Sequence, residues 1–219
     1  MQKHFSEELA ALKEKLLTMG SRAESAVSQA VQAVTGRDDD LAVQVQADDN
    51  IMDQYEIEID ELAIQLLCKA PVATDLRLIT VAMKISANLE RIGDEATTIA
   101  RRAVELNQEP PVKVRLDIPH MAEVALGMLK ESLDAFVQKQ PEQARAIVPR
   151  DKEVDAMNRR VRRELSGYMA SNPGAIPCCL SLMTVSKSLE RVADHATNIA
   201  EEVVYLCEAR DIRHEANKL

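Results

Sequence analysis

One stretch of twelve residues occurs twice in the chain and constrains its fold more than any other feature. It reads LERIGDEATTIA at positions 89–100 and LERVADHATNIA at positions 189–200. When the two windows are extended to residues 106 and 206, ten of eighteen positions are identical. Identity at this level over a constant offset is typical of an internal repeat and exceeds what a shared helical composition produces. We therefore expect a duplicated chain with two similar halves.

The repeated stretch carries apolar residues at alternating spacings of three and four in both copies. These residues are Ala82, Ile85, Leu89, Ile92, Ala96, Ile99, Ala103 and Leu106 in the first copy, and Leu182, Val185, Leu189, Val192, Ala196, Ile199, Val203 and Leu206 in the second. The spacing predicts a long α-helix that buries one stripe against neighbouring helices. Because the chain has two Phe, three Tyr and no Trp but is rich in aliphatic residues, its composition also favours an all-helical protein.

Apolar stripes also precede each copy, so we predict three helices in each half. The six helices are expected over residues 6–36, 41–70, 74–107, 120–138, 141–170 and 176–208, with an interruption of the second near residues 48–50. The earlier helices of the two halves align at an offset of 102, which pairs Val27 with Leu129 and Met52 with Val154. The predicted fold is all-α, a tandem duplication of two antiparallel three-helix bundles built from six long helices.

The proline-containing link over residues 108–119 is the best candidate for a domain boundary. It divides the chain into a first bundle, residues 1–108, and a second bundle, residues 109–219. The first half holds 11 basic and 19 acidic side chains and the second half 16 and 17, so most of the net charge of -9 lies in the first half. An acidic chain with few aromatic residues is poorly suited to bind nucleic acid, which we do not expect as a partner.

The sequence shows no sign of a signal segment or a membrane span. The Met-Gln-Lys-His-Phe start lacks an apolar stretch, and no apolar run approaches the ~20 residues that a membrane span needs. The four cysteines, Cys68, Cys178, Cys179 and Cys207, show no C-x-x-C spacing, which fits reduced thiols. We expect a soluble, cytoplasmic protein.

Paired carboxylates are the most promising functional feature of both halves. In each copy of the repeated helix, a Glu and an Asp four residues later stand one turn apart on the outward shoulder, and the middle helix of each half carries two Asp residues at the same spacing. Like charges at this spacing destabilise a helix by about 0.2–0.5 kcal/mol per pair, and a hard cation held by oxygen ligands relieves the repulsion if two such pairs converge. The predicted metal ligands are Asp49, Asp53, Glu90 and Asp94 in the first half, and Asp151, Asp155, Glu190 and Asp194 in the second.

Acids on an outer helical face are also ordinary solubilising residues, so their spacing alone leaves both interpretations open. The duplication favours metal binding, because two copies that differ at many positions keep the same acids on a face that core packing does not dictate. His195 replaces Glu95 of the first copy, and it is either paired with a nearby acid, solvated, or a phosphorelay residue.

The second half also carries a basic cluster, and neither half shows a catalytic motif. The cluster consists of Arg159, Arg160, Arg162 and Arg163, and it is either a solvated face or a surface that docks an acidic partner. No Gly-rich phosphate loop, G-x-S-x-G elbow, H-E-x-x-H motif or Cys/His nucleophile arrangement occurs in the sequence. The chain is therefore predicted not to be an enzyme.

Five segments together resemble the PhoU family of phosphate-transport regulators over nearly the whole chain. They are ADDNIMD at 47–53, PVATDLR at 71–77, LERIGDEATTIA at 89–100, RDKEVD at 150–155 and LERVADHATNIAEEVVYL at 189–206. As an ordered set in a duplicated helical chain, these segments are highly specific. The resemblance implies tandem three-helix bundles whose D-x-x-x-D and E-x-x-x-D motifs bind divalent or trivalent metal ions such as iron, manganese, zinc or magnesium, and it implies metal roles for the eight acids named above.

The resemblance also implies a function for the chain. It implies a non-catalytic adaptor that links the ATPase subunit of the phosphate ABC transporter to a phosphate sensor histidine kinase, reaches the membrane only through these partners and forms a homodimer. Such an adaptor represses phosphate uptake and starvation signalling when phosphate is abundant. One position departs from the family pattern, because Thr98 stands where the second copy has the usual Asn198. An outer-shell role at this position is therefore expected in the second half only.

Two other functions compete with this interpretation. A metal-dependent helical-bundle enzyme or metal store predicts His ligands at a buried cluster, whereas this chain has four His and places its paired carboxylates outward. An accessory protein of a different phosphate carrier would share the fold and differ only in its partner.

Overall fold

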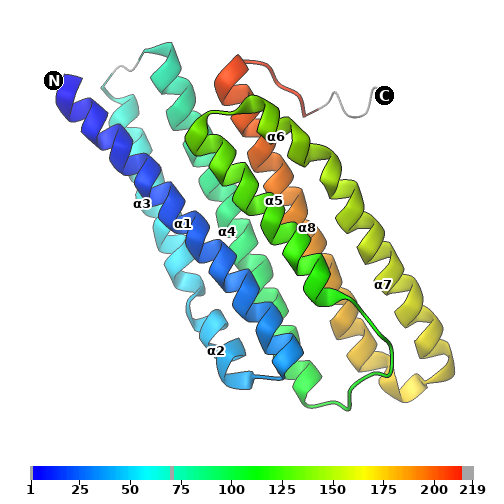
Figure 1. Ribbon diagram of the computed structural model, residues 1–219. Helices are drawn as coiled ribbons and strands as arrows, with labels where there is room; N and C mark the ends of the chain where they lie inside the picture. The colour runs from blue at the N-terminus through cyan, green and yellow to red at the C-terminus, as the bar shows by residue number, and fades with distance from the viewer. Residues whose placement is uncertain (1, 70–71, 214–219) are drawn as a thin grey trace.

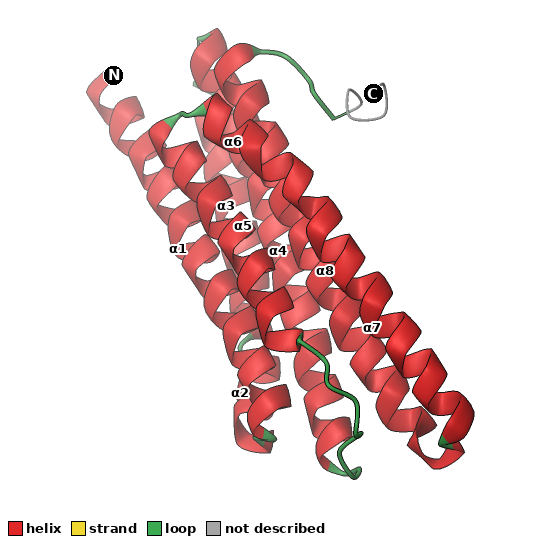
Figure 2. Cartoon of the chain, turned by 45° about the vertical axis from the view of Figure 1, so that its right-hand side comes forward, coloured by secondary structure: helices red, strands yellow, loops and turns green. Residues whose placement is uncertain are grey.

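The computed structural model describes residues 2–69 and 72–213, and this part of the chain contains helices and loops but no strand. The long helices lie side by side, and most of the connecting loops lie at the two ends of the molecule (Figures 1 and 2). The helices are α1 (Gln2–Gly36), α2 (Asp39–Ala47), α3 (Asp49–Leu67), α4 (Ala73–Asn107), α5 (Ile118–Gln138), α6 (Pro141–Ile147), α7 (Asp151–Ser171) and α8 (Ile176–Glu208), with short 3₁₀ turns η1 (Val148–Arg150) and η2 (Pro173–Ala175). The predicted all-α fold of two three-helix bundles in tandem is confirmed.

Each bundle buries the apolar stripes that the sequence predicts. In the first bundle α1, α2–α3 and α4 pack together, and in the second bundle α5, α6–α7 and α8 do so. Leu89 and Leu189, which occupy the same position in the two copies, are both fully buried. Leu182 is partly buried, and every other residue of the two stripes is buried. Burying one such aliphatic side chain contributes about 1.5–3 kcal/mol, so the stripes hold the long helices together.

The two bundles pack against each other along their length. Helix α4 packs against α8 and α1 against α5, and the two apolar cores join into one cluster. Ion pairs also cross the α4–α8 interface, where Arg191 Nη1 lies 3.0 Å from Glu95 Oε1 and Lys84 Nζ lies 3.0 Å from Glu202 Oε2. Both glutamates are buried and therefore depend on these cations for charge compensation. This interface was not predicted from the sequence.

The middle helix of each bundle is interrupted near the same place in the duplication. Asp48 separates α2 from α3, as the sequence predicted. In the second bundle α6 ends at Ile147 and a 3₁₀ turn leads into α7 at Asp151, whereas one unbroken helix was expected over residues 141–170. Pro149 accounts for the difference, because proline lacks the N–H of the helical hydrogen bond and its ring clashes with the carbonyl four residues earlier.

Four helices begin earlier than the sequence predicted, and two of them, α2 at Asp39 and α5 at Ile118, do so by two residues. Helix α1 is already helical at Gln2 rather than at Ser6, because the intervening QKHF segment contains neither glycine nor proline to end a helix. Helix α4 begins at Ala73 rather than at Thr74, and its N-cap Val72 makes no side-chain hydrogen bond. These shifts leave the order and packing of the helices unchanged.

Within residues 2–69 and 72–213, no helix combines the length and the apolar character that crossing a membrane requires. All four cysteines are free thiols, and Cys178 and Cys179 are buried. Burial raises the pKa of the thiols of Cys178, Cys179 and Cys207, which keeps them protonated and poorly nucleophilic near neutral pH.

Candidate functional site

The acidic motifs of each bundle lie on neighbouring helices, next to the break in the middle helix. Helix α3 begins at Asp49 and α7 begins at Asp151, so the D-x-x-x-D motifs occupy the first two turns of these helices. A carboxylate in the first turn is favourable because it lies near the positive end of the helix dipole. The E-x-x-x-D motifs lie on α4 and α8, which pack against α3 and α7 respectively. Helix packing thus places the two motifs of each bundle side by side.

In the first bundle, Asp53, Glu90 and Asp94 lie close enough to affect one another electrostatically. The Glu90 side chain is 16% exposed and that of Asp94 is 46% exposed. Burial, followed by the charges of Asp94, Glu56 and Asp53, raises the pKa of Glu90 to about 7, although Arg91 acts in the opposite direction. Arg91 Nε lies 3.4 Å from Glu90 Oε2, and Arg91 Nη1 lies 3.2 Å from Asp94 Oδ2. Arg91 therefore serves as the counter-ion of this pair.

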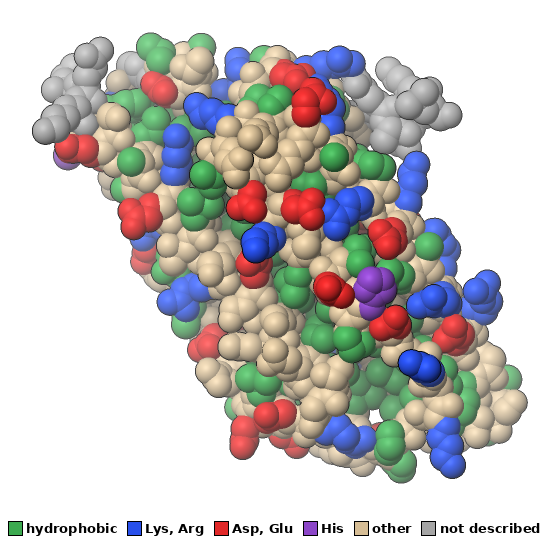
Figure 3. All heavy atoms as spheres, in the orientation of Figure 1, with side chains coloured by type: hydrophobic (Ala, Val, Ile, Leu, Met, Phe, Trp, Pro, Cys, Tyr) green, Lys and Arg blue, Asp and Glu red, His purple; other side chains and the backbone are tan. Residues whose placement is uncertain are grey.

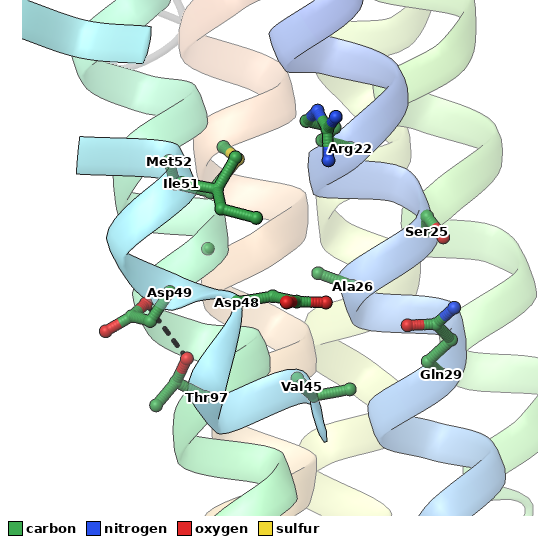
Figure 4. Close-up of a pocket in the computed structure, with 11 residues that line it drawn as sticks. Arg22, Ser25, Ala26, Gln29, Val45, Asp48, Asp49, Ile51, Met52 and Thr97 are labelled. Carbon is green, nitrogen blue, oxygen red and sulfur yellow. Dashed lines mark hydrogen bonds between the residues drawn. The ribbon is translucent and has the colours of Figure 1, made fainter. Parts of the chain in front are cut away.

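Glu56 belongs to the same cluster, although it was not among the ligands predicted from the sequence. Its pKa is raised first by burial and then by the charges of Asp60 and Asp53. The sequence signal was its position one turn beyond Asp53 on the same face of α3. Asp49 has a different neighbour, because Thr97 Oγ1 donates to Asp49 Oδ1 at 3.0 Å (Figure 4). The first cluster is therefore centred one turn further along α3 than expected.

In the second bundle Asp151 lies near each of the other three predicted carboxylates, Asp155, Glu190 and Asp194. Burial, followed by the charge of Asp155, raises the pKa of Asp151. Burial, followed by the charges of Glu190 and Asp151, raises the pKa of Asp194 to about 7. The carboxyl groups of Asp151 and Asp194 thus lie close enough to affect each other's pKa. Lys187 forms an ion pair with Glu190 and is the nearest counter-ion of this cluster.

The ligand chemistry of both clusters fits a hard metal ion, but the carboxylates do not form a complete coordination shell. All of the predicted donors are carboxylate oxygens, and Asp151 Oδ1 is buried without a hydrogen-bond donor. Within the part of the chain that the structure describes, no three Asp, Glu, His or Cys side chains are arranged to hold a metal ion. Metal binding would require rotation of these side chains and release of the ion pairs with Arg91 and Lys187. The eight-ligand assignment stays a prediction.

A hollow of about 550 Å³ lies between the bundles, and residues from both acidic clusters border it. Its lining consists of Asp49, Arg91, Asp94, Glu95, Thr97, Thr98, Arg101, Arg191, Asp194, His195 and Asn198. His195 Nδ1 lies 2.9 Å from Asn88 Oδ1, and Asn198 Nδ2 lies 3.3 Å from the same oxygen. Burial lowers the pKa of His195, which favours the neutral imidazole. His195 and Asn198 thus connect α8 to α4, and this role favours a structural function of the histidine over a phosphorelay.

The basic cluster lies on the outer face of α7. Arg159, Arg160, Arg162 and Arg163 are all exposed. In Figure 3 lysine and arginine side chains gather along the right-hand edge of the molecule, over α7. Asn158, which stands where the first bundle has Glu56, is buried and accepts a hydrogen bond of 2.9 Å from Ser186. The outer face of the middle helix is therefore acidic in the first bundle and basic in the second.

The fold and these sites define a class of protein, a tandem pair of three-helix bundles with two carboxylate clusters. Comparison with known proteins narrows this class. The family model of the PhoU domain matches residues 16–103 and 118–203. The chain belongs to the PhoU family.

Relatives of known name and structure agree with this assignment. The chain is 41% identical over 204 residues to the phosphate-specific transport system accessory protein PhoU homolog of Rhizobium meliloti (strain 1021), covering 92% of this chain and 86% of that protein. It is 34% identical over 211 residues to the accessory protein PhoU of Escherichia coli (strain K12), covering 96% and 88%. The crystal structure of PhoU from Pseudomonas aeruginosa aligns with a TM-score of 0.90 at 39% identity, covering 94% of this chain and all of that one.

The family assignment decides two of the predictions made from the sequence. The resemblance to PhoU proteins is confirmed. The PhoU family is a family of regulatory accessory proteins and not of enzymes, so the prediction of a non-catalytic protein is also confirmed.

Proposed function

We propose that the protein is a cytoplasmic negative regulator of phosphate uptake and of phosphate-starvation signalling. It acts as a non-catalytic adaptor between the ATPase subunit of the phosphate ABC transporter and a phosphate sensor histidine kinase, and it meets the membrane only through these partners. The observation that supports this proposal most is the match of nearly the whole chain to proteins named phosphate-specific transport system accessory proteins. We further propose that the adaptor is a homodimer.

The two carboxylate clusters give this adaptor a means of changing its surface charge. Glu90 and Asp194 have pKa values of about 7, so their charge near neutral pH responds to any neighbouring cation. A metal ion such as iron, manganese, zinc or magnesium would be held by the eight acids predicted above and would supply the positive charge that offsets their repulsion. The neutralised face could then meet a partner surface that bare carboxylates would repel.

Capture of partners from cells tests the adaptor role. Tagged protein is purified from phosphate-replete and phosphate-starved cells, and the co-purified proteins are identified by mass spectrometry. We expect the transporter ATPase and the sensor kinase in the phosphate-replete sample, and less of both with the Glu90→Gln, Asp94→Asn double variant. Glu61→Gln is a matched control, because Glu61 is an exposed acid on α3 outside the cluster. Absence of both partners from the wild-type sample would contradict the proposal.

The same capture experiment distinguishes the proposed adaptor from an accessory protein of a different phosphate carrier. An accessory protein of a different phosphate carrier would recover that carrier instead of the ABC transporter. A metal store or metal-dependent enzyme has less support, because it calls for histidine ligands and His195 is engaged with Asn88 at the interface between the bundles.

A further inference from the structure

A small hollow of about 190 Å³ lies in the first bundle, between α1, the α2–α3 break and α4 (Figure 4). Asp48 from the break lines it, together with Ser25 and Gln29 from α1. Figure 4 shows the Asp48 carboxylate pointing toward α1, whereas the Asp49 carboxylate lies on the other side of the chain, beside Thr97. The carboxylates of the two adjacent aspartates therefore point in different directions and cannot bind the same ion.

The second bundle fills the corresponding place with one of its own side chains. At the offset of 102 that aligns the bundles, the corresponding pairs are Asp48 and Arg150, Gln29 and Glu131, and Ser25 and Gly127. Arg150 Nη1 donates to Glu131 Oε2 at 2.7 Å. A Cβ atom at Gly127 would lie 3.6 Å from Arg150 Nη2, so the guanidinium lies directly over the α5 backbone at this glycine. The Arg150 guanidinium thus occupies the place that is hollow in the first bundle.

The residues at the two helix breaks carry opposite charges, because Asp48 is an acid and Arg150 is a base. The acid at the first break points to a cation from outside the first bundle. In the second bundle the helix break supplies the cation and α5 supplies the acid. In the first bundle the break supplies the acid, Asp48, and α1 supplies the neutral amide of Gln29. Arg22 is the one basic residue among the described residues that line the hollow. Its guanidinium lies 5.5 Å from the centroid of the Tyr55 ring, so it is already engaged by a cation–π contact.

The lining suits an arginine side chain. A carboxylate and an amide oxygen match the fork of donors on a planar guanidinium, which binds such groups more specifically than a lysine ammonium does. Val45, Ile51 and Met52 provide apolar surface along which the methylene stem of an arginine can lie. The second bundle provides a partial precedent, because its own guanidinium binds the carboxylate of Glu131, the residue equivalent to Gln29.

We propose that this hollow receives an arginine side chain of a protein partner, in the place that Arg150 fills in the second bundle. The proposal rests on the adaptor role only for the assumption that the arginine belongs to a protein. Binding of the side chain itself is a property of the isolated chain and can be tested without any partner.

The direct test is a titration of the purified full-length protein with N-acetyl-L-arginine amide, followed by ¹⁵N NMR in the presence of a metal chelator. We expect saturable shifts at the backbone amides of Gln29, Asp48 and Thr97. The probe N-acetyl-L-citrulline amide has nearly the same shape without the charge. It should bind about tenfold more weakly, because it replaces a charge-assisted hydrogen bond with a neutral one.

Two variants locate the binding. Asp48→Asn keeps the size of the side chain and should weaken binding of the arginine probe about tenfold, because only the carboxylate charge is lost. The double variant Gln29→Glu, Asp48→Arg copies the pair of the second bundle, and it should fill the hollow and abolish binding. Asp134→Asn is the control, because Asp134 is an exposed acid on α5 outside the hollow, and it should leave binding unchanged. Circular dichroism confirms that each variant is folded.

Three results would overturn the proposal. These are no saturable shift in the wild type, equal binding of the arginine and citrulline probes, and undiminished binding by Asp48→Asn. The proposal and the adaptor role can fail separately. If the arginine probe binds but no transporter ATPase or kinase is captured from cells, the adaptor role fails and the arginine site stands. If partners are captured but the arginine probe does not bind, the arginine site fails.

Discussion

The two bundles share one scaffold, yet the surroundings of their carboxylate clusters differ. In the first bundle Glu56 extends the cluster, and the Asp94 side chain is 46% exposed. In the second bundle the matching position is Asn158, a buried amide that is hydrogen-bonded to Ser186. The duplicated acids were kept while their neighbours changed in charge and burial. Two sites with the same predicted ligands therefore need not have the same affinity or the same response to pH.

The largest expected effect concerns the cores, where the bundles should be equivalent. Leu89→Ala and Leu189→Ala each remove a fully buried side chain from the same position of the repeat. Each should lower the free energy of unfolding by about 2–5 kcal/mol. Because the two cores form one cluster across the α4–α8 interface, both variants should shift a single denaturant-induced transition monitored by circular dichroism. Two separate transitions would show that the bundles unfold independently.

Metal content distinguishes the two clusters. The Glu90→Gln, Asp94→Asn variant should lose the metal of the first bundle, and the Asp151→Asn, Asp194→Asn variant that of the second. Loss of even an outer-shell partner lowers metal affinity about 10–100-fold, so loss of two ligands should empty the affected site. Inductively coupled plasma mass spectrometry of the purified proteins measures the difference. Unchanged metal content in either double variant would remove the ligand assignment for that bundle.

A smaller effect is expected in the pH dependence of stability without metal. Glu90 has a pKa of about 7 in the folded protein and an ordinary value of 4.5, so the folded state binds the extra proton between these values. Its contribution to stability is present below about pH 4.5 and is lost as the pH rises toward 7. Because the group is partly solvated, Glu90→Gln should become more stable than the wild type by only about 1 kcal/mol over this range.

Thermal unfolding at several pH values in the presence of a chelator measures this difference. Asp194→Asn should show the same trend, because the pKa of Asp194 is also raised to about 7. A Glu90→Gln variant that loses stability relative to the wild type as the pH rises would contradict the raised pKa.

The smallest effect on stability, and the sharpest test of the equivalence of the two hollows, comes from Arg150→Ala. The ion pair of Arg150 with Glu131 is partly exposed, with 32% and 45% exposure of the two side chains, so its loss should cost about 0.5 kcal/mol. The variant should also gain a second site for N-acetyl-L-arginine amide, with NMR shifts near Glu131. Failure to gain this site would show that the two places are not equivalent.

Much of the fold could be predicted from the sequence because a heptad stripe such as that around Leu89 specifies both a helix and its buried face. The break at Asp48 was predicted, but the break at Pro149 was missed because a strong helical pattern continues on both sides of it. The pattern of apolar residues also does not show which helix of the other bundle covers the polar face of a given helix. Glu95 and Glu202 resemble solvent-exposed acids in the sequence, yet the α4–α8 interface buries them.

The candidate site was only partly predictable for the same reason. The spacing of Glu90 and Asp94 indicated their shared face, and the alignment of the halves indicated their partners on the middle helix. Spacing along one helix does not fix the register between helices, so it could not show that Glu56 approaches Glu90 or that Asp49 pairs with Thr97. The position of the Arg150 side chain over Gly127 could likewise not be predicted from the sequence, because it depends on contact between different helices.

The contacts between α4 and α8 have a mechanical consequence. Glu95 directly follows Asp94, and its partner Arg191 directly follows Glu190, so a single ion pair ties the backbone beside one cluster to the backbone beside the other. A turn of either helix that re-aims its own acids would stretch or break this ion pair. A metal ion at one cluster would then change the metal affinity of the other, by no more than the free energy of this ion pair.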